Sequence, residues 1–216
     1  ARADESTRAI VLTSALEKYF CVGLDVRDVF DYDRDRMARF WVKFVDLYEA
    51  IYDFPKPVIA ALNGHTFAGG IILALACDVR LMARGPRGLG VSGINLGLAL
   101  PRGVMNMAIN AVGHGHARRL FLTGETIDPD TALTMGLVHE LTAPSDLLAR
   151  SVARAEDLGQ KSPAAFRKIH RMFDELSGRD ELESDRANLD QFLETWFAPD
   201  AIANRERARE RIARAK

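Results

Sequence analysis

Two glycine-bearing turns are the features of this sequence that could do chemistry. The first runs over Phe20–Asp25 (FCVGLD) and the second over Asn63–Gly70 (NGHTFAGG). Each could expose backbone N–H groups, and a glycine pair that opens a helix allows close approach by a ligand. If the two turns converge, their N–H groups would form an oxyanion hole, which stabilises an enolate or a tetrahedral oxyanion. Taken alone, a Gly-Gly pair before a helix is more often explained by tight packing.

The sequence offers few further groups that could move a proton. His65 lies in the second turn and Asp78 follows a buried apolar helix. Packing explains the histidine more simply, and hydrogen bonds to neighbouring backbone explain the aspartate, because a buried acid without partners is costly. Glu125 is expected to be structural. His114 and His116 lie where a helix is expected to begin, and could contact a phosphate or nothing.

Buried strands and helices must position the two turns. Ala9–Thr13 (AIVLT) and Val58–Leu62 (VIAAL) are short apolar runs, typical of strands buried on both faces of a largely parallel sheet. Apolar residues recur every three or four positions over Met37–Ile51, which predicts an amphipathic helix. Gly70–Cys77 predicts a short buried helix, and Asp78–Ala83 a further strand. This alternation indicates an α/β domain with right-handed parallel crossovers, whose ligands gather at the carboxyl ends of the strands.

Helices dominate the second half of the sequence, with one further strand expected at Leu137–Leu141. The expected helices are Val104–Val112, His116–Leu122, Thr131–Met135, Asp146–Leu158, Pro163–Leu176, Leu182–Phe197 and Asp200–Ala215. The last four have narrow apolar stripes, as expected of helices that pack on a neighbour or a partner subunit. The C-terminal ERARERIARAK is interpreted as a solvated helix end, with a nucleic-acid-binding tail as the distant alternative.

The composition argues against several classes of partner. Among 216 residues, 29 basic and 30 acidic side chains leave a net charge of −1, so no global field would recruit a nucleic acid. Cys21 and Cys77 lie in apolar stretches, which favours reduced buried thiols over a disulfide or a metal site. No apolar run approaches the roughly 20 residues that span a bilayer. We therefore expect a cytoplasmic protein without membrane contact, or a peroxisomal or mitochondrial one if the source is eukaryotic.

Three segments, in order and at matching spacing, resemble the enoyl-CoA hydratase/isomerase (crotonase) family. They are FCVGLDV, KPVIAALNGHTFAGGIILALACDVRLMA and GINLGLALPRGVMNMAINAVGHGHARRLFLTGETIDPDTALTMGLVHEL. The resemblance is continuous from about Ala9 to Leu141, and weaker helical similarity continues to the end of the chain.

The resemblance implies a fold and an assembly. The fold would be an α/β spiral core of repeated ββα units in residues 1–141, followed by a helical trimerisation region in residues 142–216. The partner would be an acyl-CoA thioester, and the assembly a homotrimer or a dimer of trimers. No metal or redox cofactor is implied, since coenzyme A enters as part of the substrate. Family members begin with about one further strand and helix, so we expect a shortened or truncated core with an exposed sheet edge.

The resemblance also assigns a site. The backbone N–H groups of Leu24 and Gly69 would form the oxyanion hole and bond the thioester carbonyl oxygen of a bound acyl-CoA. Further substrate contacts would come from Val22, Asp25, Val26, Arg27, Gly70, Ile72, Gly93 and Pro101. Asp25 could equally be a structural cap, and Arg27 a solvated surface charge.

The positions of the family's catalytic glutamates hold other residues in this sequence. Hydratases carry one glutamate three residues after the oxyanion glycine and a second in a later turn, and these positions are Ile72 and Gly93 here. Some isomerases place their glutamate a few residues further on, at about Pro101. General acid-base catalysis contributes about 10²–10⁴-fold, so an efficient reaction would need a substitute group.

Three functions are compatible with these residues. The first is an enoyl-CoA isomerase- or hydratase-like enzyme of fatty acid metabolism that stabilises a thioester enolate, with the isomerase slightly favoured by LNGHTFAGGIILALACDVRLM and LGLALP. The second is a noncatalytic acyl-CoA-binding or assembly subunit, favoured by Ile72 and Gly93. The third is an acyl-CoA decarboxylase or thioester hydrolase of the same family, in which a substrate carboxylate or water replaces the acids.

Overall fold

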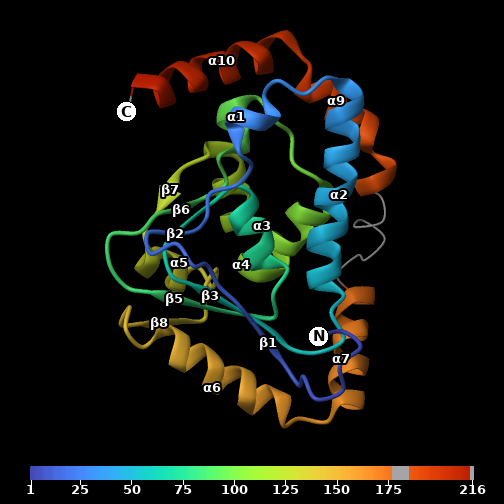
Figure 1. Ribbon diagram of the computed structural model, residues 1–216, viewed down its shortest axis with the longest axis vertical. Coiled ribbons are helices and arrows are strands. Elements are labelled where there is room, and N and C mark those ends of the chain that lie inside the picture. Colours follow the sequence, from blue (N-terminus) through green and yellow to red (C-terminus); the bar gives the residue numbers. More distant parts are fainter. Residues whose placement is uncertain (177–184, 215–216) are drawn as a thin grey trace.

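Two four-stranded sheets form the centre of the molecule. The computed structural model describes residues 1–176 and 185–214 of the chain (Figure 1). The first sheet contains, in chain order, β1 (Ile10–Leu12), β3 (Val58–Leu62), β5 (Val79–Ala83) and β8 (Glu140–Thr142). The second contains β2 (Tyr19–Cys21), β4 (His65–Phe67), β6 (Leu89–Gly90) and β7 (Thr126–Ile127). The first six strands alternate between the sheets, and each pair is followed by helix, so the predicted ββα spiral is confirmed.

The strand pairings are parallel except that of β6 with β7. The prediction that placed Phe20, Cys21 and His65–Phe67 in turns was wrong, because these residues belong to the short strands β2 and β4. They pair with each other, with Tyr19 opposite His65 and Cys21 opposite Thr66. Strands of three residues show too little periodicity to be recognised locally, and only their mutual pairing defines them.

Helices follow each strand pair and then continue alone to the C-terminus. They are α1 (Val26–Val29), α2 (Arg34–Tyr52), α3 (Gly69–Leu75), the 3₁₀ turn η1 (Ser92–Leu96), α4 (Arg102–Thr123), α5 (Pro129–Thr134), α6 (Leu147–Gly159), α7 (Pro163–Leu176), α9 (Leu189–Trp196) and α10 (Pro199–Arg214). The helix predicted over Leu182–Phe197 begins outside the described residues, and α9 is within its described part. Of the helix predicted over Asp200–Ala215, residue 215 also lies outside.

Two predicted elements differ in detail. Val104–Val112 and His116–Leu122 were expected as separate helices, and they form one element, α4, broken by Gly113 at φ 75° and ψ 160°. The strand predicted at Leu137–Leu141 is displaced to Glu140–Thr142. The displacement has a local cause, since the N–H of Leu137 donates to Ala132 O (2.9 Å) and closes the end of α5 instead of entering the sheet.

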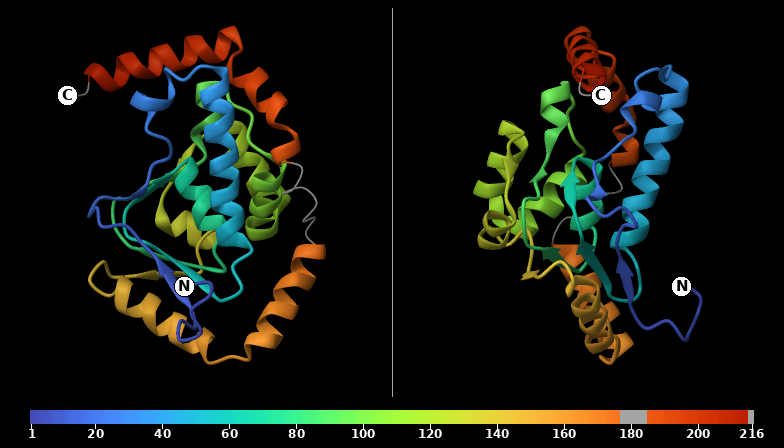
Figure 2. Two further views of the ribbon diagram at one scale, coloured as in Figure 1. Left: turned by 45° about the vertical axis from the view of Figure 1, so that its right-hand side comes forward. Right: turned by 60° about the vertical axis from the view of Figure 1, so that its left-hand side comes forward.

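Strand β3 explains the layered architecture. Its residues alternate between two hydrophobic clusters: Ala60 and Leu62 face one, and Ile59 and Ala61 face the other. The first cluster includes α2, α3, α4 and α9, whereas α6 contributes to the second from the opposite face (Figure 2). The continuous apolar run VIAAL is therefore the sequence of a strand with no solvent-facing side.

Helix α2 places aromatic side chains against this core. Its N-cap is Asp33, whose carboxylate accepts the N–H of Arg36 at 2.7 Å. Such a cap satisfies one of the donors that a helix leaves unpaired at its start. The buried face of α2 includes Trp41, whose ring stacks on Phe192 of α9 with centroids 3.6 Å apart. The long helix and the C-terminal helices thus share one core.

Three further properties concern the described residues alone. No helix in them combines the length and apolar character needed to cross a bilayer. No group of three or more His, Cys, Asp or Glu side chains in residues 1–176 and 185–214 is arranged to hold a metal ion. Cys77 is buried as predicted, but Cys21 is only partly buried, and neither cysteine forms a disulfide.

Candidate active site

The two glycine-bearing turns meet in space. Because β2 and β4 are parallel neighbours, the turns that follow them leave the same edge of the second sheet. Gly23 follows β2 and Gly69 begins α3 after β4, and a Cβ added to Gly69 would lie 3.3 Å from Gly23 Cα. The convergence on which an oxyanion hole depends is therefore present in the backbone.

Both turns present amide groups at this contact. Gly69 is the first residue of α3, and the first amides of a helix have no carbonyl partner within it. In the part of the chain that the structure describes, neither Leu24 nor Gly69 donates its N–H to a backbone carbonyl outside the regular elements. These two amides can therefore donate a hydrogen bond to a ligand oxygen without breaking such a bond.

The residue between β4 and α3 has an unusual backbone conformation. Ala68 has φ 48° and ψ −115°, and it is the only non-glycine residue with positive φ among the described residues. Such conformations cost about 1–3 kcal/mol and persist where the surrounding structure fixes them. Ala68 directly precedes the Gly69 amide, so its conformation sets the direction of that N–H group.

Two glycines are required for the turns to approach this closely. Gly23 has φ +97°, which side chains disfavour, and a Cβ there would lie 2.8 Å from Ala68 Cβ. A Cβ on Gly70 would lie 2.1 Å from the carbonyl oxygen of Cys21. Gly70 therefore allows α3 to pack directly on the end of β2.

An apolar cavity of about 150 Å³, which we call the acyl pocket, lies beside these amides. It is lined by Val22, Leu24, Phe30, Trp41, Phe44, Ala68, Gly69, Ile72, Ser92, Gly93, Leu96, Leu98, Ala99, Leu100, Phe192 and Trp196. None of these lining residues, all within the described chain, has an ionisable side chain. The pocket combines apolar walls with backbone donors, an arrangement that suits an acyl group whose carbonyl oxygen reaches the two amides.

The structure brings several of the predicted site residues to this pocket. Val22, Leu24, Gly69, Ile72 and Gly93 all line it. Ile72 and Gly93, the positions for which the resemblance implies glutamates, therefore face the same cavity as the two amide donors.

Other predicted site residues lie elsewhere. Pro101 lines a neighbouring cavity of about 200 Å³ rather than the acyl pocket. Gly70 does not line the acyl pocket either, and it packs against Cys21 of β2. The carbonyl oxygen of Asp25 accepts the N–H groups of Asp28 and Val29 at 3.0 Å, so Asp25 occupies the cap position of α1. Val26 and Arg27 are the first two residues of α1, and the structure describes their backbone but not their side chains.

The aromatic wall of the pocket was not predicted. Trp41 and Phe44 come from α2, and Phe192 and Trp196 come from α9. The sequence shows them only as apolar positions of amphipathic helices, which predicts burial without saying which cavity they enclose. Their contribution depends on the packing of α9 against α2.

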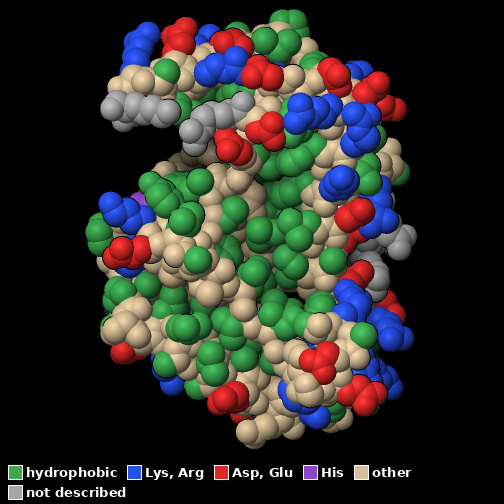
Figure 3. Space-filling model, viewed as in Figure 1, with side chains coloured by type: hydrophobic (Ala, Val, Ile, Leu, Met, Phe, Trp, Pro, Cys, Tyr) green, Lys and Arg blue, Asp and Glu red, His purple; other side chains and the backbone are tan. Residues whose placement is uncertain are grey.

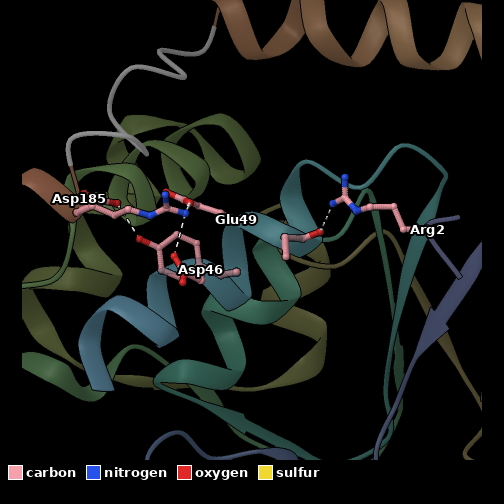
Figure 4. Close-up of polar contacts among 7 residues, drawn as sticks. Arg2, Asp46, Glu49 and Asp185 are labelled. Atoms are coloured by element: carbon pink, nitrogen blue, oxygen red, sulfur yellow. Dashed lines mark hydrogen bonds and ion pairs between the residues drawn. The ribbon is translucent and has the colours of Figure 1, made fainter. Parts of the chain in front are cut away.

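A buried carboxyl group lies in the neighbouring cavity, which shares Trp41, Phe192 and two further residues with the acyl pocket. Asp185 (Figure 4) is 2% exposed and accepts the hydroxyl of Tyr48 at 2.9 Å. It also accepts the N–H of Gly103 near the start of α4. Burial raises the pKa of Asp185 to about 6. Its hydrogen bonds make it a cap of α4 and a link to α2, so its evident role is structural.

The remaining acid-base candidates also have structural partners. His65 Nδ1 accepts the N–H of Gly88 at 2.9 Å, and the Asp78 carboxylate accepts the N–H of Val58 at 2.7 Å. Glu125 forms an ion pair with Arg119 at 2.6 Å. The prediction that these three side chains are structural agrees with these contacts.

His114 and His116 follow the break in α4 at Gly113. His114 lines a separate cavity of about 170 Å³, which contains none of the residues of the acyl pocket. The structure therefore gives no contact between these histidines and the two amide donors.

Comparison with known proteins gives a consistent result. The family model described as enoyl-CoA hydratase/isomerase matches residues 1–206. Mouse mitochondrial enoyl-CoA delta isomerase 1 is 34% identical over 153 residues, which are 69% of this chain and 53% of that protein. The short-chain-enoyl-CoA hydratase of Clostridium acetobutylicum is 30% identical over 164 residues, which are 76% of this chain and 62% of that protein. The chain thus spans little more than half the length of these relatives.

Solved structures share the architecture. Human mitochondrial delta3-delta2-enoyl-CoA isomerase superposes with a TM-score of 0.94 at 23% identity, covering 100% of this chain and 84% of the human one. At that identity the similarity establishes the fold. DspI of Pseudomonas aeruginosa superposes with a TM-score of 0.77 at 28% identity, covering 93% of this chain and 76% of its own.

Proposed function

Since the chain belongs to the enoyl-CoA hydratase/isomerase (crotonase) family, we propose that it binds an acyl-CoA thioester with the carbonyl oxygen on the N–H groups of Leu24 and Gly69. The observation that carries this proposal is the contact between the turns after β2 and β4, beside an apolar pocket of about 150 Å³. Donors that are fixed in place stabilise the negative charge that develops on the oxygen when an enolate forms.

The chemistry we propose is isomerase- or hydratase-like. In an isomerisation, a proton leaves the carbon next to the thioester, the enolate oxygen is held by the two amides, and a proton returns further along the acyl chain. Ile72 and Gly93 face the pocket at the positions of the family's glutamates and cannot transfer protons. The proposed site therefore supports enolate stabilisation more strongly than it supports fast proton transfer.

The aprotic wall favours a second candidate function, that of a noncatalytic acyl-CoA-binding subunit. Such a protein would bind the thioester and release it unchanged. Binding of a 2-enoyl- or 3-enoyl-CoA can be measured by calorimetry, and mass analysis of the recovered thioester follows directly. An altered thioester would exclude the noncatalytic function, whereas tight binding of an unchanged thioester would exclude the enzymatic one.

The donor role can be tested by removing one amide. Leu24→Pro deletes the N–H, and Leu24→Ala is the matched control because it shortens the side chain but keeps the N–H. We expect Leu24→Pro to weaken thioester binding by about tenfold or more, since a hydrogen bond to a charged or polarised oxygen contributes about 1.5–3 kcal/mol. Equal affinities of the two folded variants, as judged by circular dichroism, would contradict the oxyanion hole.

The missing acid can be tested by restoring it. A Cβ on Gly93 would lie 3.4 Å from the side chain of Leu100, an ordinary van der Waals distance, so the first atom of an introduced side chain fits there without overlap. We expect Gly93→Glu to raise isomerase or hydratase turnover by about 10²–10⁴-fold. Gly93→Gln is the control, because it has the same size and no acid. Equal turnover by the two variants would show that the acid is not what the site lacks.

We also propose assembly as a homotrimer or a dimer of trimers through the C-terminal helices. Helix α7 supports an interface, because Ile169, Phe173 and Leu176 lie on one face of it and are 55%, 64% and 83% exposed. An exposed apolar face of this kind is typical of an interaction site. Light scattering coupled to size-exclusion chromatography measures the mass directly, and a monomer at micromolar concentration would contradict the assembly.

A further inference from the structure

A cavity of about 370 Å³ lies away from the acyl pocket, where the N-terminal segment meets α6 and α7. Its walls come from residues 2–8, from the loop at Pro55–Pro57 before β3, from the end of α6 and from the start of α7. It shares no residue with the acyl pocket. Figure 1 shows α6 and α7 at the lower end of the molecule, with the N-terminus beside α7.

The lining of this cavity is strongly basic. It contains five cationic side chains and one acidic side chain, so its formal charge is 5 − 1 = +4, whereas the whole chain carries −1. The cations are Arg2, Arg8, Lys56, Lys161 and Arg167, and the acid is Glu5. We call these five cations and the cavity that they line the basic cleft. Figure 3 shows Lys and Arg side chains along the right-hand edge of the lower half of the molecule, over α7.

Neutral carbonyl groups, rather than carboxylates, position three of the cations. Arg2 Nη2 donates to Ala50 O at 3.1 Å (Figure 4), and Arg8 Nε donates to Gly159 O at 3.1 Å. Lys56 Nζ donates to Ala1 O at 2.7 Å and to a second carbonyl oxygen. A carbonyl fixes the side chain but leaves its formal charge uncompensated.

Nearby carboxylates neutralise little of this charge. Asp4 lies next to Lys56, but its carboxylate accepts the hydroxyls of Ser6 and Thr7 at 2.7 and 2.6 Å. Lys161 forms an exposed ion pair with Asp157 at 3.0 Å. Arg167 has no ion pair among the described residues. One of the five cations is therefore paired with an acid.

The positive region extends beyond one cavity. A neighbouring cavity of about 250 Å³ shares Arg2, Pro55, Phe166 and Arg167 with the basic cleft and adds Arg171, together with the acid Asp53. Arg2 and Arg167 thus line both spaces. Two guanidinium groups that line both cavities are suited to an anion with more than one charged group, because each guanidinium can bond two oxygens of a phosphate.

We propose that the basic cleft binds a small phosphorylated anion, of the pyrophosphate or organic-phosphate class. The cations recognise the phosphate oxygens, and Phe166 and Pro55 supply an apolar wall for the rest of an organic ligand. The site is separate from the proposed thioester site, since the two cavities share no lining residue. The cleft is lined by the segments before β1 and β3 and by α6 and α7, whereas the amide donors follow β2 and β4. It does not depend on whether the acyl pocket is catalytic.

The test is a titration of the whole chain with inorganic pyrophosphate, in which binding is measured by calorimetry or by changes in NMR chemical shifts. Arg167→Glu reverses a charge of the cleft, and Lys168→Glu is the matched control, because Lys168 is the next residue of α7, is exposed, and lines neither cavity. We expect saturable binding that Arg167→Glu weakens by about tenfold or more and Lys168→Glu by about twofold or less.

Two further arms make the result decisive. Arg8→Gln removes a second cation from another element and is expected to weaken binding while circular dichroism remains that of the unsubstituted protein. Saturating acyl-CoA is expected to leave pyrophosphate affinity unchanged, and competition would overturn the claim of a separate site. Absence of saturable binding, or equal weakening by Arg167→Glu and Lys168→Glu, would overturn the phosphate site itself.

Discussion

The acyl pocket and the basic cleft differ in which groups would contact a ligand: backbone amides in the pocket, and charged side chains in the cleft. In the acyl pocket the polar groups are backbone amides, held by glycines and buried apolar side chains at the carboxyl ends of β2 and β4. In the basic cleft they are long charged side chains near the amino ends of β1 and β3, and most of them are exposed. The residues of the acyl pocket belong largely to the hydrophobic core, whereas most cations of the basic cleft lie on the surface.

Because of this difference, we expect substitutions to affect ligand binding and the free energy of unfolding together in the acyl pocket, but separately in the basic cleft. A substitution in the acyl pocket is expected to change the fold and the site together, because the same atoms pack the core and face the ligand. A substitution in the basic cleft is expected to change binding with little effect on the free energy of unfolding, because exposed charges contribute little to stability.

The largest expected effect is that of Gly70→Val. The added Cβ would lie 2.1 Å from Cys21 O, so α3 must move away from β2. We expect a loss of more than about 3 kcal/mol in the free energy of unfolding, beyond the usual range for overpacked cores. Urea denaturation followed by circular dichroism measures it.

The control for this substitution is Gly115→Ala in α4. A Cβ at Gly115 meets no atom within 4 Å, and alanine favours helix over glycine by about 0.5–1 kcal/mol. The control should therefore be neutral or stabilising. If both substitutions destabilise equally, the close approach at Gly70 is not the cause.

An effect of intermediate size is expected at Asp185. Its side chain is ionisable, as are those of the basic cleft, but it is buried, as are most residues of the acyl pocket. Its pKa is raised by burial from 3.8 to about 6, so between these pH values the folded protein holds a proton that the unfolded chain releases. This group therefore makes the protein less stable as the pH rises from about 4 to about 6, by at most about 3 kcal/mol.

Asp185→Asn removes this ionisation. Relative to the unsubstituted protein, the variant should gain stability between pH 4 and pH 7, by at most about 3 kcal/mol, whatever its absolute stability at pH 4. Urea denaturation at several pH values measures the difference. Parallel pH curves for the two proteins would show that Asp185 keeps the pKa of an exposed acid.

The smallest effect is expected in the basic cleft. Lys161→Ala breaks an ion pair with Asp157 in which the side chains are 58% and 52% exposed. We expect the free energy of unfolding to change by less than about 1 kcal/mol, since exposed ion pairs contribute about 0.2–1 kcal/mol. A loss above about 2 kcal/mol in thermal or urea denaturation would mean that the cleft belongs to the core after all.

The sequence predicted best the elements whose pattern is local. The bounds of β3 and α7 agree with the prediction, because a continuous apolar run and a strong helical periodicity each identify their own structure. The strands β2 and β4 were missed because they are defined by each other. Long-range pairing of three-residue segments leaves little signal in either segment.

The two candidate regions also differed in how far the sequence predicted them. Leu24, Gly69, Ile72 and Gly93 lie at one cavity, as the family resemblance implied. The basic cleft could not be predicted, since its cations are dispersed from Arg2 to Arg167 and form no basic run. The net charge of −1, from which we expected no global field, gave no indication that the fold brings five of these cations to one cavity.

The strained backbone at Ala68 has a consequence for how a ligand would be received. Its conformation is held in the unliganded chain, so the cost of orienting the neighbouring amide is already met during folding. A thioester would then find preorganised N–H donors and lose little affinity to ordering of the protein. Complexes of this protein should accordingly show lock-and-key recognition at the turn after β4, with free and bound backbones superposing there within about 1 Å.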